Sequence, residues 1–564
     1  MAGDRLSWPT RDRGFVKVAP GDTEHAMRAR ATSETAGRDP VRDGVERGWQ
    51  VIDAALLEQD RALEADVVIV GTGAGGGTAA EILARAGLVV VMIEEGGLYT
   101  SSDFHMREAE AYPQLYQDSA ARKTRDKAIN IMQGRCVGGG TTVNWTASFR
   151  TPASTLEHWA RHHGIEDLSE TDLAPWFELM EARLNIREWP LAPNANNEAL
   201  RRGGRALNIA SQVIHRNVKA CRNLGYCGMG CPTNAKQSML VTTIPDALDH
   251  GAMLVTRTRA WKLEHEHGRI SSLVCIGLDR RGVDPTPRRI TIRARSYVCA
   301  AGAIGTPALL LRSELPDPHG LLGTRTFLHP TLVSAALMPD EVNGFSGAPQ
   351  TIYSDHFLHG GPVDGPIGYK LEAPPVHPIL AATTLSGHGP AHAEWMAQLP
   401  HMHVLVALLR DGFHPLSIGG TVKLGDDSTP VLDYALTDYV WDGARRALLS
   451  MAEIQFAAGA RRVRPVHGSG LSFDTWRDAK AGIGQMTMKP LVAPLVSAHV
   501  MGGCALGSDP RTSVVDTSGR HRHMDNLHVI DGSLFPTSIG ANPQLSIYAL
   551  SAKLASQLAT TLSH

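Results

Sequence analysis

The chain has 564 residues, too many for one hydrophobic core, so two or more lobes are expected. A formal charge of −2 and a charged content of 20% argue against binding to nucleic acid or to an anionic membrane surface. No apolar run approaches the ~20 residues of a membrane helix, and residues 1–22 lack the apolar core of a signal peptide. We therefore expect a cytoplasmic protein with an N-terminal extension over residues 1–60.

The first predicted elements form a βαβ unit. Residues 66–70 (DVVIV) are a short apolar run typical of a buried parallel strand. Residues 77–87 are helical in pattern, and residues 88–94 (LVVVMIE) form a second strand. This order predicts an α/β fold with a doubly wound, Rossmann-like sheet.

A glycine fingerprint follows the first strand. Gly71, Gly73 and Gly76 fit the pattern G-x-G-x-x-G, which permits a tight turn, close approach to a pyrophosphate and close packing of helix on strand. Glu94, at the end of the second strand, is the expected ribose ligand, with Glu95 as its adjacent alternative. The fingerprint predicts a dinucleotide site, but by itself it does not separate NAD from FAD.

The middle of the chain has a different character from its two ends. Residues 165–215 are predicted to be largely helical and residues 255–300 to be strands. Residues 330–490 are rich in Pro, Gly and His with short strands, the profile of an inserted lobe. The last 65 residues return to glycine-rich strand and helix, so a nucleotide domain interrupted by a substrate domain is expected.

Three further segments carry a family resemblance. They are GRCVGGGTTVN (134–144), CAAGAIGTPALLLRS (299–313) and HVIDGSLFPTSIGANPQLSIYAL (528–550). Together they resemble the glucose–methanol–choline (GMC) flavin oxidoreductases, from about residue 64 to the end of the chain. The resemblance implies FAD as the cofactor, bound non-covalently because residues 138–144 contain no histidine for ring attachment.

The resemblance also suggests domains and a branch of the family. It implies an FAD-binding domain in three parts (61–165, 221–330 and 491–564) and a substrate-binding domain with an antiparallel sheet (166–220 and 331–490). Four stretches resemble the long-chain alcohol oxidase and bacterial alcohol dehydrogenase branch: LVTTIPDAL (240–248), VNGFSGAPQTIYSD (342–355), YKLEAPPVHP (369–378) and AAGARRV (457–463).

The same resemblance implies the remaining flavin contacts, which are Gly138, Gly139, Asn144, Asp531 and Gly532. Backbone N–H groups of the turn at residues 531–532 are suited to this contact.

The second loop carries the family's G-x-x-x-[ST]-P turn at Gly302, Thr306 and Pro307. One departure from the family pattern is Glu314, where glycine usually follows the position of Ser313.

Alcohol oxidation needs a group that takes the hydroxyl proton while hydride passes to flavin N5, and imidazole suits this role. His499 resembles the active-site histidine of the family, with Val500 in place of the usual proline. Asn542 occupies the position where the family has His or Asn, and an amide is not a base. We therefore expect His499 as the base and Asn542 as the residue that orients the alcohol, while Asn542 also suits a helix N-cap.

Two groups of residues raise the question of a metal. His521 and His523 have no third ligand at metal spacing, so a solvated loop is the expected interpretation. Cys221, Cys227 and Cys231 have no fourth ligand for zinc, and a reducing compartment disfavours a disulfide. They resemble the Cys-x5-Cys-x3-Cys-Pro run of GMC dehydrogenases that hold an iron–sulfur cluster, and plain buried thiols are the alternative.

The expected function is therefore oxidation of a CH–OH donor, favouring a hydrophobic or aromatic alcohol. The electron acceptor is left open among oxygen, a quinone and a cytochrome-like carrier, the last reached through the iron–sulfur cluster. Two rival hypotheses are an NAD-linked dehydrogenase and a flavin-binding redox relay without its own alcohol. The first leaves residues 134–144 and 497–546 unexplained, and the second expects His499 or Asn542 to be missing.

Overall fold

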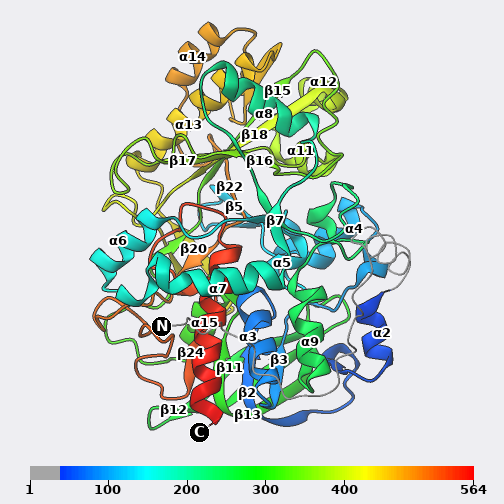
Figure 1. The fold of residues 1–564 in the computed structure, drawn as a ribbon, viewed down its shortest axis with the longest axis vertical. Helices are drawn as coiled ribbons and strands as arrows, with labels where there is room; N and C mark the ends of the chain where they lie inside the picture. The colour runs from blue at the N-terminus through cyan, green and yellow to red at the C-terminus, as the bar shows by residue number, and fades with distance from the viewer. Residues whose placement is uncertain (1–38, 564) are drawn as a thin grey trace, which may run out of the picture.

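The computed structural model describes residues 39–563, which form two lobes stacked along the long axis of the molecule (Figure 1). The lower lobe contains the N-terminal βαβ unit and the C-terminal helix, and the upper lobe is built from the middle of the chain (Figure 1). None of the described helices is long and apolar enough to cross a membrane.

The lower lobe is organised around an eight-stranded sheet. Its strand order is β1-β10-β3-β2-β13-β12-β11, and β24 pairs with β13. In chain order the strands are β1 (Gln50–Asp53), β2 (Arg61–Val70), β3 (Val90–Ile93), β10 (Met253–Thr256), β11 (Thr258–Glu266), β12 (Arg269–Leu278), β13 (Pro285–Cys299) and β24 (Leu527–Val529). All pairs of neighbours are parallel except β11–β12 and β12–β13, which are antiparallel. The predicted Rossmann-like sheet is confirmed.

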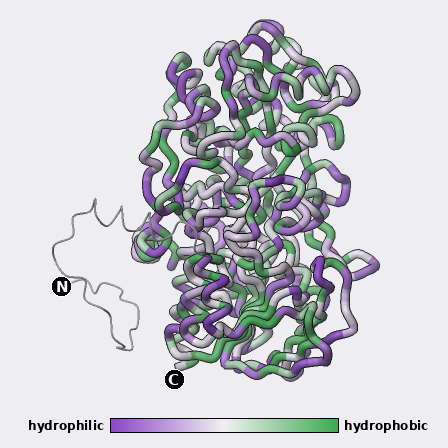
Figure 2. The backbone as a smooth tube through the Cα atoms, turned by 90° about the vertical axis from the view of Figure 1, so that its right-hand side faces the viewer, coloured by the Kyte–Doolittle hydropathy of each residue, from purple (hydrophilic) through white to green (hydrophobic). Residues whose placement is uncertain are grey.

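Helices bury the centre of this sheet. The last four residues of β2 and all of β3 are buried, as expected for strands with helices on both faces. The long helix α15 (Gln544–Ser563) packs on α3 (Ala74–Arg85) and on α7 (Glu170–Arg183), and α9 (Thr243–Asp249) packs on α3. Figure 2 shows the hydrophobic strands gathered inside the lower lobe.

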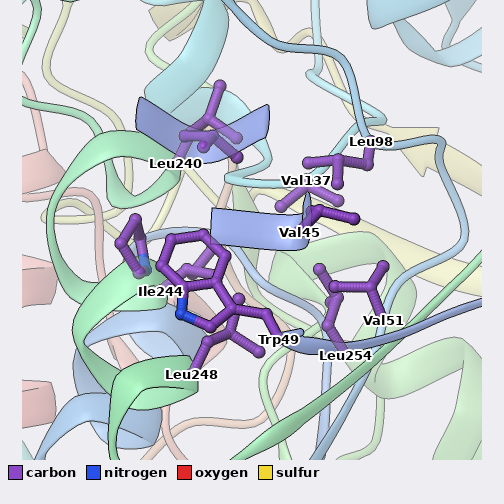
Figure 3. A pocket seen from close by; sticks show the side chains of 11 residues that line it. Val45, Trp49, Val51, Leu98, Val137, Leu240, Ile244, Leu248 and Leu254 are labelled. Atoms are coloured by element: carbon purple, nitrogen blue, oxygen red, sulfur yellow. The ribbon is translucent and has the colours of Figure 1, made fainter. Parts of the chain in front are cut away.

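The start of the described chain belongs to the lower lobe. Helix α2 (Pro40–Glu46) precedes β1, which pairs in parallel with β10, and Nε1 of Trp49 donates to Oδ1 of Asp249 at 2.7 Å. The side chains of this segment close an apolar pocket (Figure 3) lined by Val41, Val45, Trp49, Val51, Leu98, Val137, Leu240, Ile244, Pro245, Leu248 and Leu254. The expected surface extension is therefore wrong for residues 40–53, because their apolar side chains complete the sheet edge; residues 1–38 lie outside the described part.

The upper lobe contains a nine-stranded sheet that is mainly antiparallel, as predicted. Its order is β4-β5-β22-β15-β18-β17-β16-β8, with β21 pairing to β15. The strands are β4 (Arg122–Lys123), β5 (Ile129–Ile131), β8 (Gln212–Val213), β15 (Thr331–Leu337), β16 (Ile352–Ser354), β17 (Tyr369–Glu372), β18 (Met402–Leu409), β21 (Arg462–Pro465) and β22 (Leu495–Ser497). Helix α13 (Asp438–Ala457) packs on β15 and β18 and forms much of the core of this lobe.

Smaller sheets connect the lobes. One contains β14 (Thr326–Phe327), β19 (Gly420–Leu424), β20 (Pro430–Tyr434) and β23 (Met501–Gly502), and the other contains β6 (Ala147–Ser148), β7 (Ile186–Glu188) and β9 (His215–Asn217). The remaining helices are α4 (Glu108–Leu115), α5 (Gly140–Val143), α6 (Ala153–His163), α8 (Ala195–Ala206), α10 (Gly302–Arg312), α11 (Pro378–Thr384), α12 (Gly389–Ala397) and α14 (Trp476–Gln485).

Candidate active site

The glycine fingerprint lies between β2 and α3, and close packing explains its composition. A Cβ on Gly76 would lie 1.9 Å from the carbonyl oxygen of Gly71, and one on Gly75 would lie 2.0 Å from that of Ile530. Gly71 has a φ of 99°, a value that favours glycine. By contrast, a Cβ on Gly73 would meet only the Cα of Gly139, at 3.9 Å. The fingerprint is thus tight against protein on one side and open on the other.

The second glycine loop closes over the first. The N–H of Gly138 donates to Oγ1 of Thr72 at 3.0 Å, and a Cβ on Gly139 would lie 2.8 Å from the Cα of Gly73. A Cβ on Gly140, the first residue of α5, would meet nothing within 4 Å. Two backbone segments without side chains therefore pack against each other at the N-terminus of α3, where backbone N–H groups are suited to a phosphate.

Glu94 lies at the end of β3, as predicted, and is buried. Its Oε2 accepts from N–H and Oγ1 of Thr72 at 3.2 and 2.6 Å, and its Oε1 accepts from Gly96 N–H at 2.9 Å. Burial raises the pKa of this carboxyl despite these bonds. Glu95 instead pairs with Arg135 and Arg259 at 3.1 and 3.0 Å. Since Glu95 is committed to two arginines, Glu94 is the better placed of the two for a ribose.

Asp531 links the C-terminal turn to the G-x-x-x-[ST]-P turn. Its Oδ2 accepts from Gly302 N–H at 2.8 Å and Thr306 Oγ1 at 2.6 Å, and its Oδ1 accepts from Ser533 N–H at 2.8 Å and Ser533 Oγ at 2.5 Å. Its carboxylate therefore holds protein segments together, and only the backbone of this turn is available for a ligand. A Cβ on Gly532 would lie 3.5 Å from the carbonyl oxygen of Val500, the residue after His499.

Asn144 caps the C-terminal end of α5 and contacts the start of the last helix. Its Nδ2 donates to Oε1 of Gln544 at 2.7 Å, and its Oδ1 accepts from Thr146 N–H at 3.2 Å. Its backbone N–H donates to the carbonyl oxygen of Gly140 at 2.9 Å. Asn144 thus lies directly after the glycine loop, with its side-chain amide already engaged by protein.

His499 is brought opposite His329 by the pairing of two chain segments. Phe327 pairs with Met501 and Thr331 pairs with Val496, so the residues between them run antiparallel. The two Nδ1 atoms are 3.1 Å apart. No sequence motif marks His329. It could be found only from the strand pairing that places it opposite His499.

The contacts of His329 determine which ring nitrogens carry hydrogen. The N–H of Gly540 donates to Nε2 of His329 at 3.1 Å, so that nitrogen must be unprotonated. A neutral His329 then carries hydrogen on Nδ1 and donates it to Nδ1 of His499. In this arrangement the ring hydrogen of His499 lies on Nε2. Burial and the charge of Lys370 lower the pKa of His499 to about 3, so the ring is neutral near pH 7.

Asp411 holds the segment that carries His329. Its carboxylate accepts from Leu328 N–H at 2.9 Å, from His329 N–H at 3.1 Å and from the hydroxyl of Tyr434 at 2.6 Å. Burial raises the pKa of Asp411. This buried carboxylate holds the backbone of residues 328–329 and does not bond to a ring nitrogen of His329. No sequence motif marks Asp411 either.

Asn542 is buried, 4% exposed, two residues after Gly540. Through Gly540 and His329 it belongs to the same cluster as His499, so the structure brings the two predicted catalytic residues together. Its amide contacts Lys370 and Glu372 of β17, at 3.5 and 3.3 Å respectively. Lys370 and Glu372 are not among the predicted site residues. They lie in residues 369–378, which resemble the long-chain alcohol oxidase branch.

The three cysteines of residues 221–231 lie in one loop, and each sulfur accepts a hydrogen bond from the protein. Within residues 39–563, no three His, Cys, Asp or Glu side chains are placed to hold a metal ion together, and all seven thiols are free. Cys221 accepts from Asn223 N–H at 3.4 Å, Cys231 from Lys236 N–H at 3.5 Å and Cys227 from Arg216 at 3.7 Å. The iron–sulfur hypothesis therefore stays a prediction, because a cluster would take the three thiolates in place of these weak hydrogen bonds.

The cysteine loop instead supports the glycine loop. The ammonium of Lys236 donates to the carbonyl oxygens of Thr142, Asn144 and Cys227 at 2.7, 2.8 and 2.6 Å. The hydroxyl of Tyr116 donates to the carbonyl oxygen of Gly228 at 2.7 Å. Burial lowers the pKa of Lys236 to about 8. The loop is a packed structural support directly beneath α5.

The histidines near residue 522 also hold no metal site among the described residues. His523 is exposed as expected, but His521 is buried, 2% exposed, which lowers its pKa to about 4. The expected solvated loop is therefore wrong for His521, because the isolated bridge between Val515 and His521 draws it inward.

Known proteins confirm the family. The sequence patterns of the GMC oxidoreductases match residues 91–331 and 413–551. An uncharacterized GMC-type oxidoreductase of Sinorhizobium fredii is 31% identical over 507 residues, which are 88% of this chain and 95% of that protein. A long-chain-alcohol oxidase of Arabidopsis thaliana is 28% identical over 522 residues, covering 88% of this chain and 67% of the plant protein.

Solved structures show the same fold. Pyridoxine 4-oxidase from Mesorbium loti superposes with a TM-score of 0.63 at 18% identity, covering 87% of this chain and 98% of that one. A formate oxidase variant from Aspergillus oryzae gives a TM-score of 0.65 at 14% identity, covering 89% and 99%. The open glycine cradle fits the FAD that this family binds. The chain belongs to the GMC oxidoreductase family and is an FAD-dependent oxidoreductase.

Proposed function

We propose that this protein oxidises a hydrophobic or aromatic alcohol to the carbonyl compound, with oxygen as the final electron acceptor. The observation that carries the proposal is the cluster of His499, His329, Gly540 and Asn542, which adjoins the flavin turn through Val500 and Gly532. The long-chain-alcohol oxidases among the relatives support the substrate class and the acceptor.

The residues assigned to the cofactor follow from the cradle. Gly71, Gly73 and Gly76 would hold the pyrophosphate, Glu94 the ribose, and the backbone of residues 138–139 and 531–532 the flavin side. Bound FAD would supply the two-electron acceptor, taking hydride at flavin N5. Asn144 would act from beside the loop, through a hydrogen bond that Gln544 now occupies.

His499 is the proposed base. The hydroxyl proton of the alcohol goes to its Nε2 while the C–H bond breaks, and its electron pair leaves with the hydride to give the carbonyl. Nε2 accepts a proton only when His499 holds its own hydrogen on Nδ1, which requires His329 to move its hydrogen to Nε2. That exchange costs the hydrogen bond from Gly540 N–H, about 1–3 kcal/mol. Asn542 orients the hydroxyl with its remaining N–H or lone pair.

The test uses FAD-loaded protein mixed anaerobically with 1-decanol or benzyl alcohol while flavin absorbance is followed. We expect bleaching by at least one alcohol, restored by oxygen with hydrogen peroxide as product. His499→Ala should slow bleaching about 10²–10⁴-fold with FAD retained. A near-normal rate in that variant sinks the base assignment. If a quinone but not oxygen reoxidises the reduced flavin, the acceptor is a quinone and the proposal of oxygen is wrong.

A further inference from the structure

Strand β17 places two ionisable side chains beside Asn542. Because alternate residues of a strand point to opposite faces, Lys370 and Glu372 share one face, while Tyr369 and Leu371 point into the core of the upper lobe. Lys370 is 2% exposed and Glu372 is 0% exposed. A buried ammonium and a buried carboxylate therefore lie at the centre of the candidate site.

These two groups match the two ends of the Asn542 amide. The ammonium of Lys370 lies 3.5 Å from Oδ1 of Asn542, and Nδ2 of Asn542 donates to Oε2 of Glu372 at 3.3 Å. The same Oε2 accepts a hydrogen bond from Nε2 of Gln350. A flipped amide would set its NH₂ against the ammonium and its oxygen against the carboxylate, both repulsive. The pair thus selects one orientation and leaves one N–H and one lone pair for a ligand.

Stability does not explain the pair. Its two charges are 3.6 Å apart, and Oε1 of Glu372 has no hydrogen-bond partner among the described residues. Replacing a buried ion pair of this kind with apolar residues is often neutral or stabilising. The ammonium does lie 2.8 and 4.3 Å from the ring centroids of Phe149 and Tyr353, and such contacts favour a cation. The two aromatic rings thus stabilise an ammonium whose carboxylate partner is incompletely hydrogen-bonded. This indicates that the pair serves Asn542 rather than stability.

The charge of Lys370 also acts on His499 and His329. Burial lowers the pKa of Lys370 to about 7, against the opposing charges of Glu372 and Asp355. Burial raises the pKa of Glu372. Burial lowers the pKa of both His499 and His329, and the charge of Lys370 lowers both further.

The other charged group that acts on this cluster is Arg410, after β18, which also lowers the pKa of His329. Its guanidinium donates to the carbonyl oxygens of Leu358 and Val363 at 3.1 and 3.0 Å, so it is held away by backbone acceptors.

We propose that Lys370 and Glu372 are positioning residues, a buried ion pair that fixes the amide of Asn542 and places a positive charge near His499. The proposal rests on the proposed function for its meaning in catalysis. Neither residue is assigned contact with the reacting atoms. Both act through Asn542 and His499.

The principal variants are Lys370→Met and Glu372→Gln in the FAD-loaded enzyme. Lys553→Met is the matched control, since Lys553 is also buried but bonds to Asp167 from α15. We expect Lys370→Met to slow anaerobic flavin reduction by benzyl alcohol or 1-decanol about 10²-fold, with a normal FAD content. The pH dependence of that rate near pH 7 should disappear in Lys370→Met and persist in Lys553→Met. A wild-type rate and pH profile in Lys370→Met would overturn the proposal.

A second measurement does not depend on any alcohol. In protein labelled with ¹⁵N-histidine, the pKa of His499 should rise by about one unit or more in Lys370→Met, because a nearby like charge has been removed. Glu372→Gln should lower it or leave it low. If no alcohol reduces the flavin, the proposed function fails, and this titration still decides the electrostatic role. An unchanged His499 titration in Lys370→Met overturns that role.

Discussion

The two halves of the candidate site are built in different ways. The cofactor cradle consists of backbone: Gly71, Gly73, Gly76 and the loop at residues 138–140 contribute shape by lacking side chains. The catalytic half consists of side chains from distant segments, with His329, Lys370, His499 and Asn542 meeting across both lobes. A backbone site tolerates almost no added atoms, whereas a side-chain site loses function in steps, as individual hydrogen bonds and charges are removed.

The largest effect is expected in the cradle, from Gly76→Ala. The added Cβ would lie 1.9 Å from the carbonyl oxygen of Gly71, a contact that only a backbone shift relieves. We expect the purified protein to contain less than about a tenth of one FAD per chain, measured by absorbance after denaturation. The control is Gly484→Ala in α14, where a Cβ meets nothing within 4 Å. Full FAD content in Gly76→Ala would show that the cradle is more plastic than its packing indicates.

This difference also explains what the sequence could predict. The fingerprint residues and Glu94 are contiguous or at fixed spacing, so this part of the cradle follows from local pattern. The loop at residues 138–140 follows only from family resemblance. His499 and Asn542 followed only from family resemblance. His329 and Lys370 were missed because a single histidine or lysine carries no local signal. Their contacts with His499 and Asn542 join residues 170 and 172 positions apart.

The cysteine loop and the N-terminal segment show what a local pattern leaves out. The spacing of Cys221, Cys227 and Cys231 predicts a shared ligand, and only the structure shows that each sulfur also has its own hydrogen-bond donor in the protein. Residues 40–53 have no net charge bias that marks them, yet Trp49 and its apolar neighbours dock on the sheet edge. The spacing of cysteines along the chain does not determine the conformation of their loop. The composition of a segment does not determine whether it packs on the rest of the fold.

In the side-chain half, His329→Ala should reduce but not abolish turnover. The variant removes the acceptor of Gly540 N–H and the partner of His499 Nδ1, so the His499 ring loses its fixed orientation. We expect the limiting rate of flavin reduction to fall about 10–100-fold with FAD content unchanged. His403→Ala is the matched control: this buried histidine contacts Asn196 at 2.7 Å, outside the cluster. Equal losses of rate in both variants would contradict a specific role for His329.

Buried titratable groups should give the stability two separate pH windows. The pKa of His499 is lowered to about 3 and that of His329 is lowered too, so the unfolded chain binds more protons between pH 6.5 and 3. Stability should therefore fall as pH drops below 6.5, by up to about 1.4 kcal/mol per pH unit for each histidine. The pKa of Lys370, lowered to about 7, predicts stability that rises from pH 7 toward 10.

Thermal unfolding of the FAD-loaded enzyme across pH 4–10 separates the two windows. Lys370→Met should remove the rise in melting temperature between pH 7 and 8. It should keep the rise above pH 8, to which Lys236, with its pKa lowered to about 8, also contributes, and the loss below pH 6.5. If the rise between pH 7 and 8 survives in Lys370→Met, another group causes it.

The smallest effect concerns one residue of the cofactor domain that departs from the family pattern. Glu314 follows the C-cap of α10 with a φ of 54°, and the N–H groups of Glu314 and Leu315 bond back to Leu311 and Leu310 at 3.1 and 3.3 Å. This is the helix ending at which glycine is preferred, because a Cβ costs about 1–2 kcal/mol in the left-handed region. The greater freedom of glycine in the unfolded chain offsets about 0.5–1 kcal/mol of that gain. Glu314→Gly should therefore raise the melting temperature by about 1 °C, whereas Glu314→Gln, which keeps the Cβ, should leave it unchanged. An equal rise in both variants would assign the cost to the charge of an exposed carboxylate rather than to the backbone.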